Sequence, residues 1–315
     1  MKLHIAVNQY VAYRKSLGDS FQTNEKALKA FVRAVGQKKN LSDVRGKQVD
    51  IFLAGKGPIT AYWHNKYRAL RGFYRYVLSR GYTKISPLPI TIPKRPQPLV
   101  PYIYSIKELR ALFEACFTYQ KIRGQIEPSM ARTILLLLYG AGLRIREAAL
   151  LTLADVDLTQ SLITIRETKF RKTRLVPVGP QLTQVLLHYI QHCQREGHSQ
   201  STKAPFFINR NGKGISLSTI ENNFQQIRKR AGICRTDGGR YQPRLHDLRH
   251  TFAVHRLTTW YKEGADVQKW LPVLSVYLGH TKLAATSIYL TMTPTLLEEA
   301  GKRFEHYAFK EVCHD

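Results

Sequence analysis

A proline-rich segment about one third of the way along the chain most limits what this sequence can fold into. Residues 85–102 read ISPLPITIPKRPQPLVPY and contain six prolines. Proline lacks a backbone N–H and fixes φ, so this density excludes a helix interior and a central strand. We therefore predict an extended linker over residues 85–101 with a folded domain on each side. A length of 315 residues agrees with two domains at the usual size of roughly 150 residues.

The segment before the linker, residues 1–84, has the apolar spacing of a small helical domain. Positions 27, 28, 31, 32 and 35 are apolar and share one helical face. Residues 62–77 add an aromatic and aliphatic stripe, which we expect to be mainly core. Basic residues alternate with that stripe, and few acids accompany them, so we expect them to face DNA; they are Lys66, Arg68, Arg71, Arg75 and Arg80.

The segment after the linker predicts a mainly helical domain with one small antiparallel sheet. Ser105, with Glu108 three residues later, has the pattern of a helix N-cap. Residues 155–178 alternate and turn like short strands. Further helices are expected at 131–139, 143–153, 181–195 and 216–232, with a strand and a turn at 205–214. The predicted fold class of the whole chain is therefore mainly α with a small antiparallel β-sheet.

The charge balance indicates a polyanionic partner. The formal net charge is +27, of which +15 falls in residues 1–95 and +12 in the longer remainder. Nucleic acid is favoured over a membrane surface. No apolar run approaches the ~20 residues of a membrane span, and the first residues lack a signal-peptide pattern. The four cysteines are scattered, which favours reduced thiols in a cytoplasmic compartment over disulfides or a zinc site.

The chemistry-bearing residues lie in the second half of the chain. Arg144 follows a glycine break at an expected helix start, where backbone N–H groups favour an anion. His246-Asp-Leu-Arg249 is the strongest local motif. His246 and His250 have the spacing of a zinc pair, but the fixed charge of Arg249 and the lack of a third ligand oppose a metal. For His250 we favour a structural role. No metal, ATP loop or other cofactor is expected.

Two further residues complete a set suited to phosphodiester chemistry. His280 follows Leu-Gly, and Tyr289 lies nine residues later. The order Arg, His-x-x-Arg, His, Tyr, with GLRIREAALLTLADVD around Arg144, resembles the tyrosine recombinases of the phage-integrase family. TKFRKTRLVPV is similar to the family's β-hairpin, whose lysine protonates the leaving oxygen. Lys169 fits that position best, and Lys172 is the alternative. The resemblance thus implies a catalytic set of Arg144, Lys169, His246, Arg249, His280 and Tyr289.

The same resemblance implies the architecture. Residues 1–84 would be a helical, SAM-like core-binding domain and residues 102–290 the integrase-type catalytic domain, together forming a C-shaped clamp on DNA. Residues 291–315 would be a helical tail that docks on a neighbouring subunit, although packing on its own domain is an equal alternative. Between Arg249 and His280 the chain is several residues longer than the family pattern. We expect the extra turn at a helix end, around 258–262 or 270–272.

The function implied is site-specific recombination. Tyr289 would attack the scissile phosphate of double-stranded DNA at a specific core site, and a 3′-phosphotyrosyl link would store the energy for rejoining. The family implies a synaptic tetramer, accessory DNA-bending or directionality factors, and a role in integrating, excising or resolving a mobile element in bacteria or phage, on the nucleoid. The alternatives are a DNA-binding regulator with decayed chemistry and a type IB topoisomerase-like relaxing enzyme.

Overall fold

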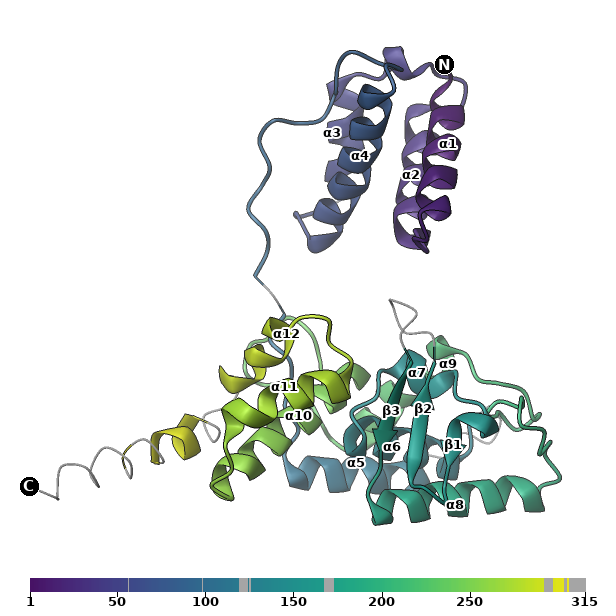
Figure 1. The fold of residues 1–315 in the computed structure, drawn as a ribbon, viewed down its shortest axis with the longest axis vertical. Helices are drawn as coiled ribbons and strands as arrows, with labels where there is room; N and C mark the ends of the chain where they lie inside the picture. Colours follow the sequence, from purple (N-terminus) through teal and green to yellow (C-terminus); the bar gives the residue numbers. More distant parts are fainter. Residues whose placement is uncertain are drawn as a thin grey trace, which may run out of the picture. The chain divides into compact units, whose positions relative to one another are not determined.

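The computed structural model describes residues 1–55, 57–97, 99–118, 124, 126–166, 173–291, 297–302 and 305. The chain divides into two compact units, residues 1–98 (unit 1) and 99–315 (unit 2) (Figure 1). The described residues are mostly helical, with a three-stranded antiparallel sheet. This confirms the predicted fold class. None of the helices in these ranges combines the length and apolar character that a bilayer span needs.

Unit 1 is a bundle of helices around one apolar core. The five apolar positions predicted between residues 27 and 35 are all buried on one face of the second helix. Gly72, on the fourth helix, lies against the hydroxyl of Tyr10, and a Cβ there would come within 2.5 Å of it. The first and fourth helices therefore pack closely at this point. The helices are α1 (Leu3–Ser16), α2 (Gln22–Val35), α3 (Gly46–Ala54) and α4 (Ala61–Ser79), with a short 3-10 turn, η1 (Leu41–Asp43).

Helix α4 corrects one expectation about the basic residues. Phe73 and Val77 are buried as predicted, and Arg68, Arg71 and Arg75 are exposed. Lys66, which we expected to face DNA, is buried instead, and its amine donates a hydrogen bond to a backbone carbonyl of α3. Burial lowers the pKa of this amine. The helical spacing places position 66 on the core face, and its long side chain reaches an unpaired carbonyl there.

The proline segment contains neither helix nor strand in its described residues. Ile85 and Ile90 are largely exposed, as expected of an extended linker. The chain is fixed again at Tyr104, which is fully buried. The backbone N–H of Tyr104 donates to the hydroxyl of Thr251 at 3.0 Å. The first residues of unit 2 are therefore held by a hydrogen bond to the helix that carries the His-x-x-Arg motif.

Unit 2 begins as predicted with a capped helix. The backbone N–H and hydroxyl of Ser105 both donate to the Glu108 carboxylate at 2.8 Å, and the N–H of Glu108 donates back to the Ser105 hydroxyl. The helices are α5 (Ile106–Thr118), α6 (Pro128–Gly140), α7 (Ile145–Ala149), α8 (Pro180–Arg195), α9 (Leu217–Arg230), α10 (Leu245–Lys262), α11 (Val267–Leu278) and α12 (Ala284–Ser287), with 3-10 turns η2 (Leu153–Asp155) and η3 (Ile288–Thr291).

The sheet forms where the sequence predicted it. Strands β1 (Val156–Asp157), β2 (Leu162–Ile165) and β3 (Arg174–Pro177) pair antiparallel in the order β1-β2-β3. Two expectations nearby were wrong. The helix predicted over 143–153 ends at Ala149, because the chain turns at Leu150 and residues 151–154 hydrogen-bond to the backbone of residues 202–206 instead. Residues 205–214 form isolated bridges rather than a strand, since Pro205 pairs with Thr152 and Ile208 pairs with Gly214 within the same segment.

Helix α10 packs against both α6 and α11. Its apolar residues divide between two cores: Leu248 joins the core of α5, α6 and the sheet, while Phe252 and Leu257 join a smaller core with α11 and η3. Gly142 has φ +59°, and a Cβ there would strike the Phe252 ring at 2.5 Å. The glycine break after α6 thus lets this loop lie directly on α10.

Both places proposed for the extra turn lie within helices. The first proposed location, 258–262, is the last turn of α10. The second, 270–272, lies within α11. The rings of Trp260 and Trp270 stack with centroids 5.9 Å apart, so the two helices are held together beside the short loop between them.

Candidate active site

The first turns of α10 supply three of the side chains of the site: His246, Arg249 and His250. The helix start is fixed by Asp247, its third residue, which is buried and accepts a hydrogen bond of 2.8 Å from the backbone N–H of Arg244. The guanidinium of Arg244 also pairs with this carboxylate. A carboxylate at this position suits the positive end of the helix dipole. The histidines and Arg249 therefore project from a rigid turn.

Arg249 is the most enclosed of the predicted site residues, with 1% of its surface exposed. Its guanidinium donates to the backbone carbonyls of Gly142 and Leu278, at 2.5 Å in each case. Burial, followed by the nearby charge of Arg144, lowers the pKa of Arg249 to about 10. The group is still charged at neutral pH. It therefore holds a fixed cation at the point where the loop after α6 and the end of α11 meet α10.

Arg144 occupies the N-cap of α7, as the sequence predicted. Its guanidinium donates to the carbonyl of Gly279 at 3.0 Å and pairs with Glu147 at 2.7 Å. About a third of its side chain is exposed, so a ligand can still reach it. Arg146, two residues further along the same Gly-Leu-Arg-Ile-Arg run, is exposed. The structure thus favours Arg144 over Arg146 as the arginine of the site.

Two residues that we did not single out from the sequence support these arginines. Two guanidinium nitrogens of Arg174 donate to Glu147, at 2.8 and 3.0 Å, and the third donates to the carbonyl of Tyr277. Burial alone would raise the pKa of Glu147, but the hydrogen bonds from Arg174 and from the N–H of Arg144 outweigh it and lower the pKa to about 2. Glu147 could have been inferred as a capping residue three positions after Arg144. Arg174 carries no such local signal.

His280 follows the left-handed Gly279 that ends α11. Its Nε2 lies 3.2 Å from a nitrogen of Arg249, and its Nδ1 lies 2.7 Å from the hydroxyl of Thr286. A guanidinium can only donate, so Nε2 is the acceptor and Nδ1 carries the proton that Thr286 accepts. Burial and the charge of Arg249 lower the pKa of His280 to about 4, which agrees with a neutral ring. Thr286 is fully buried and is another residue that the sequence did not indicate.

Tyr289 lies in η3 with only 2% of its surface exposed. Its hydroxyl is 3.1 Å from Nδ1 of His250, and its ring centre is 6.2 Å from that of His280. Burial raises the pKa of the phenol, while the charges of Arg249 and Arg144 oppose that rise. The phenol is therefore protonated at neutral pH, and two arginines favour its ionised form.

His246 is exposed, in contrast to the other histidines of the site. Its ring stands edge-on to that of His250, with centroids 4.7 Å apart. Partial desolvation of the ring, followed by the charge of Arg249, lowers the pKa of His246. In the described residues no group of three or more His, Cys, Asp or Glu side chains could hold a metal ion.

Lys169 and its alternative Lys172 lie outside the described residues. The strands that flank them are described: β2 ends at Ile165, and β3 begins at Arg174. Because Arg174 bonds to Glu147, one strand of this hairpin is tied to the site. Of the six predicted residues, the structure thus brings five together: Arg144, His246, Arg249, His280 and Tyr289.

A comparison with known proteins agrees with this arrangement. The sequence profile of the phage integrase family matches residues 105–295. The chain belongs to this family. It is 32% identical to the integrase/recombinase y4rB of Sinorhizobium fredii over 95% of this chain and 96% of that protein. It is 30% identical to the tyrosine recombinase XerC of Thermodesulfovibrio yellowstonii over 88% of this chain and 83% of XerC.

Solved integrase structures share the fold. The Tn1549 transposon integrase in complex with transposon right-end DNA has a TM-score of 0.69 and 16% identity, covering 98% of this chain and 100% of that chain. A λ integrase dimer bound to a COC′ core site has a TM-score of 0.66 and 16% identity, covering 93% and 78%. With these relatives, the family recognised from the sequence is confirmed, and the chain is a tyrosine recombinase, a DNA strand transferase for site-specific recombination.

Proposed function

We propose that this recombinase cuts and rejoins double-stranded DNA at a specific core site through a 3′-phosphotyrosyl intermediate on Tyr289. The observation that carries the proposal is the convergence of Arg144, Arg249 and His280 near Tyr289. Arg144 donates to the carbonyl of Gly279, the residue before His280, and Arg249 donates to Nε2 of His280. Fixed guanidinium donors such as those of Arg144 and Arg249 stabilise the charge that develops on the non-bridging oxygens of a phosphate under attack.

Each residue has a role in the proposed step. The Tyr289 oxygen forms a bond to phosphorus, and the bond from phosphorus to the 5′ oxygen breaks. Arg144 and Arg249 hold the phosphate oxygens, His280 orients the Arg249 guanidinium through its Nε2, and the exposed His246 assists proton transfer at the DNA side of the site. Lys169, or Lys172 in the same hairpin turn, protonates the leaving 5′ oxygen. The 5′ hydroxyl of a partner strand then attacks the phosphotyrosine and restores Tyr289.

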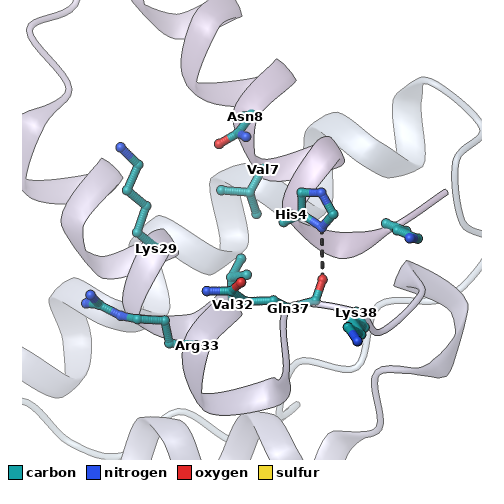
Figure 2. Close-up of a pocket in the computed structure, with 9 residues that line it drawn as sticks. His4, Val7, Asn8, Lys29, Val32, Arg33, Gln37 and Lys38 are labelled. Atoms are coloured by element: carbon teal, nitrogen blue, oxygen red, sulfur yellow. Dashed lines mark hydrogen bonds between the residues drawn. The ribbon is translucent and has the colours of Figure 1, made fainter.

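Unit 1 supplies further support for DNA as the partner. A pocket of about 420 Å³ between α1 and α2 is lined by several cations. Figure 2 shows Lys29 and Arg33 extending from α2 beside it, with His4 donating a hydrogen bond of 2.9 Å to the carbonyl of Gln37. The exposed arginines of α4 are further cations on the surface of unit 1. We propose that unit 1 is the core-binding domain and that both units contact the duplex.

The oligomeric part of the proposal rests on exposed apolar side chains. On α11, Val273 and Val276 are 51% and 72% exposed, and Leu283 and Ile288 follow in the segment that carries the nucleophile. Apolar groups gathered on a surface indicate a binding site. We propose that they receive the C-terminal tail of a neighbouring subunit in a synaptic tetramer, where Leu297, itself 52% exposed, would be one contact. Accessory bending or directionality factors, and a place on the cytoplasmic nucleoid, belong to the same proposal.

The test uses a DNA substrate with a nick near the cleavage point, so that the broken strand diffuses away and the adduct accumulates. Sequence flanking the gene supplies the DNA. The wild-type protein, incubated with a metal chelator, is expected to give a covalent protein–DNA band on a denaturing gel. Tyr289→Phe is expected to give none. DNA that is bound but never linked would favour a regulator with decayed chemistry. Relaxation of supercoils without a defined pair of sites would favour a topoisomerase.

A further inference from the structure

His250 touches the reacting group, although the set of six catalytic residues does not include it. Its Nδ1 lies 3.1 Å from the Tyr289 hydroxyl, within hydrogen-bond distance. It is half-buried, and its ring packs against that of Tyr289 with centroids 5.5 Å apart. The contact joins residues on α10 and η3, two elements that also share an apolar core. Its geometry is therefore fixed by packing on both sides.

The other two histidines are less suited to take the tyrosine proton. Nε2 of His280 accepts from Arg249, and Nδ1 donates to Thr286, so neither nitrogen has a free lone pair directed at Tyr289. His246 is exposed and contacts the ring of His250 rather than the phenol. In the part of the chain that the structure describes, His250 is the imidazole that hydrogen-bonds to the nucleophile.

We propose that His250 is the catalytic base for Tyr289: its Nδ1 accepts the hydroxyl proton as the phenolic oxygen bonds to phosphorus. The proposal rests on the proposed function of Tyr289. In the forward step the O–H bond breaks, the proton passes to Nδ1, the phosphorus–oxygen bond forms, and the leaving 5′ oxygen takes a proton from the hairpin lysine. In the rejoining step the neutral hairpin lysine takes the proton of the attacking 5′ hydroxyl, and the protonated imidazole returns its proton to the departing phenolate. No oxidant, reductant or metal enters the balance.

The surroundings keep His250 in the state that a base requires. Burial comes first in lowering the pKa of His250 to about 3, followed by the positive or ionisable groups that face it: His246, Arg244 and Arg249 on α10, and His280 after α11. The ring is therefore neutral at physiological pH and has a lone pair to offer. A bound phosphate, which is negative, offsets these cations and stabilises the protonated ring during the step.

The deciding variant is His250→Asn. Its side-chain oxygen accepts a hydrogen bond near the position of Nδ1 but cannot take up a proton at neutral pH. If His250 is the base, His250→Asn forms the covalent adduct about 10²–10⁴-fold more slowly at neutral pH. Its rate then climbs about tenfold per pH unit toward pH 9, because hydroxide must replace the base, while the wild-type rate changes little above pH 7. Addition of imidazole to His250→Ala restores part of the rate.

Two controls separate this proposal from the proposed function. If wild type forms no adduct, or Tyr289→Phe forms one, the proposed function fails and His250 is not at issue. A substrate with sulfur in place of the leaving 5′ oxygen needs no acid, so it rescues Lys169→Ala but not His250→Asn. Retained DNA affinity and an unchanged melting temperature exclude misfolding. A His250→Asn rate within about threefold of wild type, with the wild-type pH profile, would overturn the assignment and leave His250 as a positioning residue.

Discussion

The two units use their basic side chains in opposite ways. In unit 1, Arg68, Arg71 and Arg75 lie exposed along α4. In unit 2, Arg249 and Arg174 are enclosed, and their guanidinium groups end on backbone carbonyls or on Glu147. A cation in water attracts any nearby phosphate, whereas one fixed by the fold presents its charge at a single point. Unit 1 is thus suited to affinity and unit 2 to position, which predicts different responses to substitution.

The largest effect is expected for Arg249→Lys. Lysine retains the charge but cannot donate to both Gly142 and Leu278 while also facing the phosphate. Adduct formation should fall by at least ~10³-fold, measured with the nicked substrate under single turnover. Tyr289→Phe is the reference for complete loss. A rate within about tenfold of wild type would mean that charge alone, and not its fixed position, is what unit 2 contributes.

Glu147→Gln should lower the stability of unit 2. The pKa of Glu147 is held near 2 in the fold, below its usual 4.5, so its contribution is complete above pH 4.5 and is lost as the pH falls toward 2. The shift corresponds to about 3 kcal/mol of unfolding free energy at pH 7. Urea unfolding in a Trp63→Phe background lets Trp260 and Trp270 report unit 2 alone. The difference between wild type and Glu147→Gln should shrink below pH 4.5.

Neutralising unit 1 should weaken binding without changing the chemistry. Arg71→Gln with Arg75→Gln removes two exposed cations, so the slope of log affinity against log salt should flatten by about 1.8. The adduct rate at saturating protein should stay unchanged. Arg195→Gln, an exposed position at the end of α8, is the matched control. An unchanged slope would show that α4 does not contact phosphate.

The smallest effect is expected for Thr286→Val. Valine keeps the shape but cannot accept the Nδ1 proton of His280, so the tautomer that receives the Arg249 hydrogen bond loses its support. A loss of one such bond corresponds to roughly tenfold in adduct rate. Thr286→Ser restores the hydroxyl and should restore the rate. Equal rates for the serine and valine variants would show that the tautomer of His280 does not matter.

Residues identified from the sequence lie in short motifs that resemble those of the family. Arg144 follows a glycine break, and His246 and Arg249 stand one helical turn apart, and the order of these motifs along the chain selected them. Glu147 and Arg174 interact across 27 residues, and His250 reaches Tyr289 across 39. Such partners become visible only when packing has set the distance between two elements. Composition was least informative for Lys66, because helical phase rather than charge decided which side of α4 it occupies.

The bonds of Arg249 to Gly142 and Leu278 have a consequence for how this protein can lose its activity over time. A descendant that kept the fold but gave up cutting DNA would still need that guanidinium to close the two loops on α10. His246 is exposed and serves no such purpose, so it would be free to drift. In a set of descendants, the presence of Arg249 would record an intact scaffold, whereas the loss of His246 would be an early mark of abandoned chemistry.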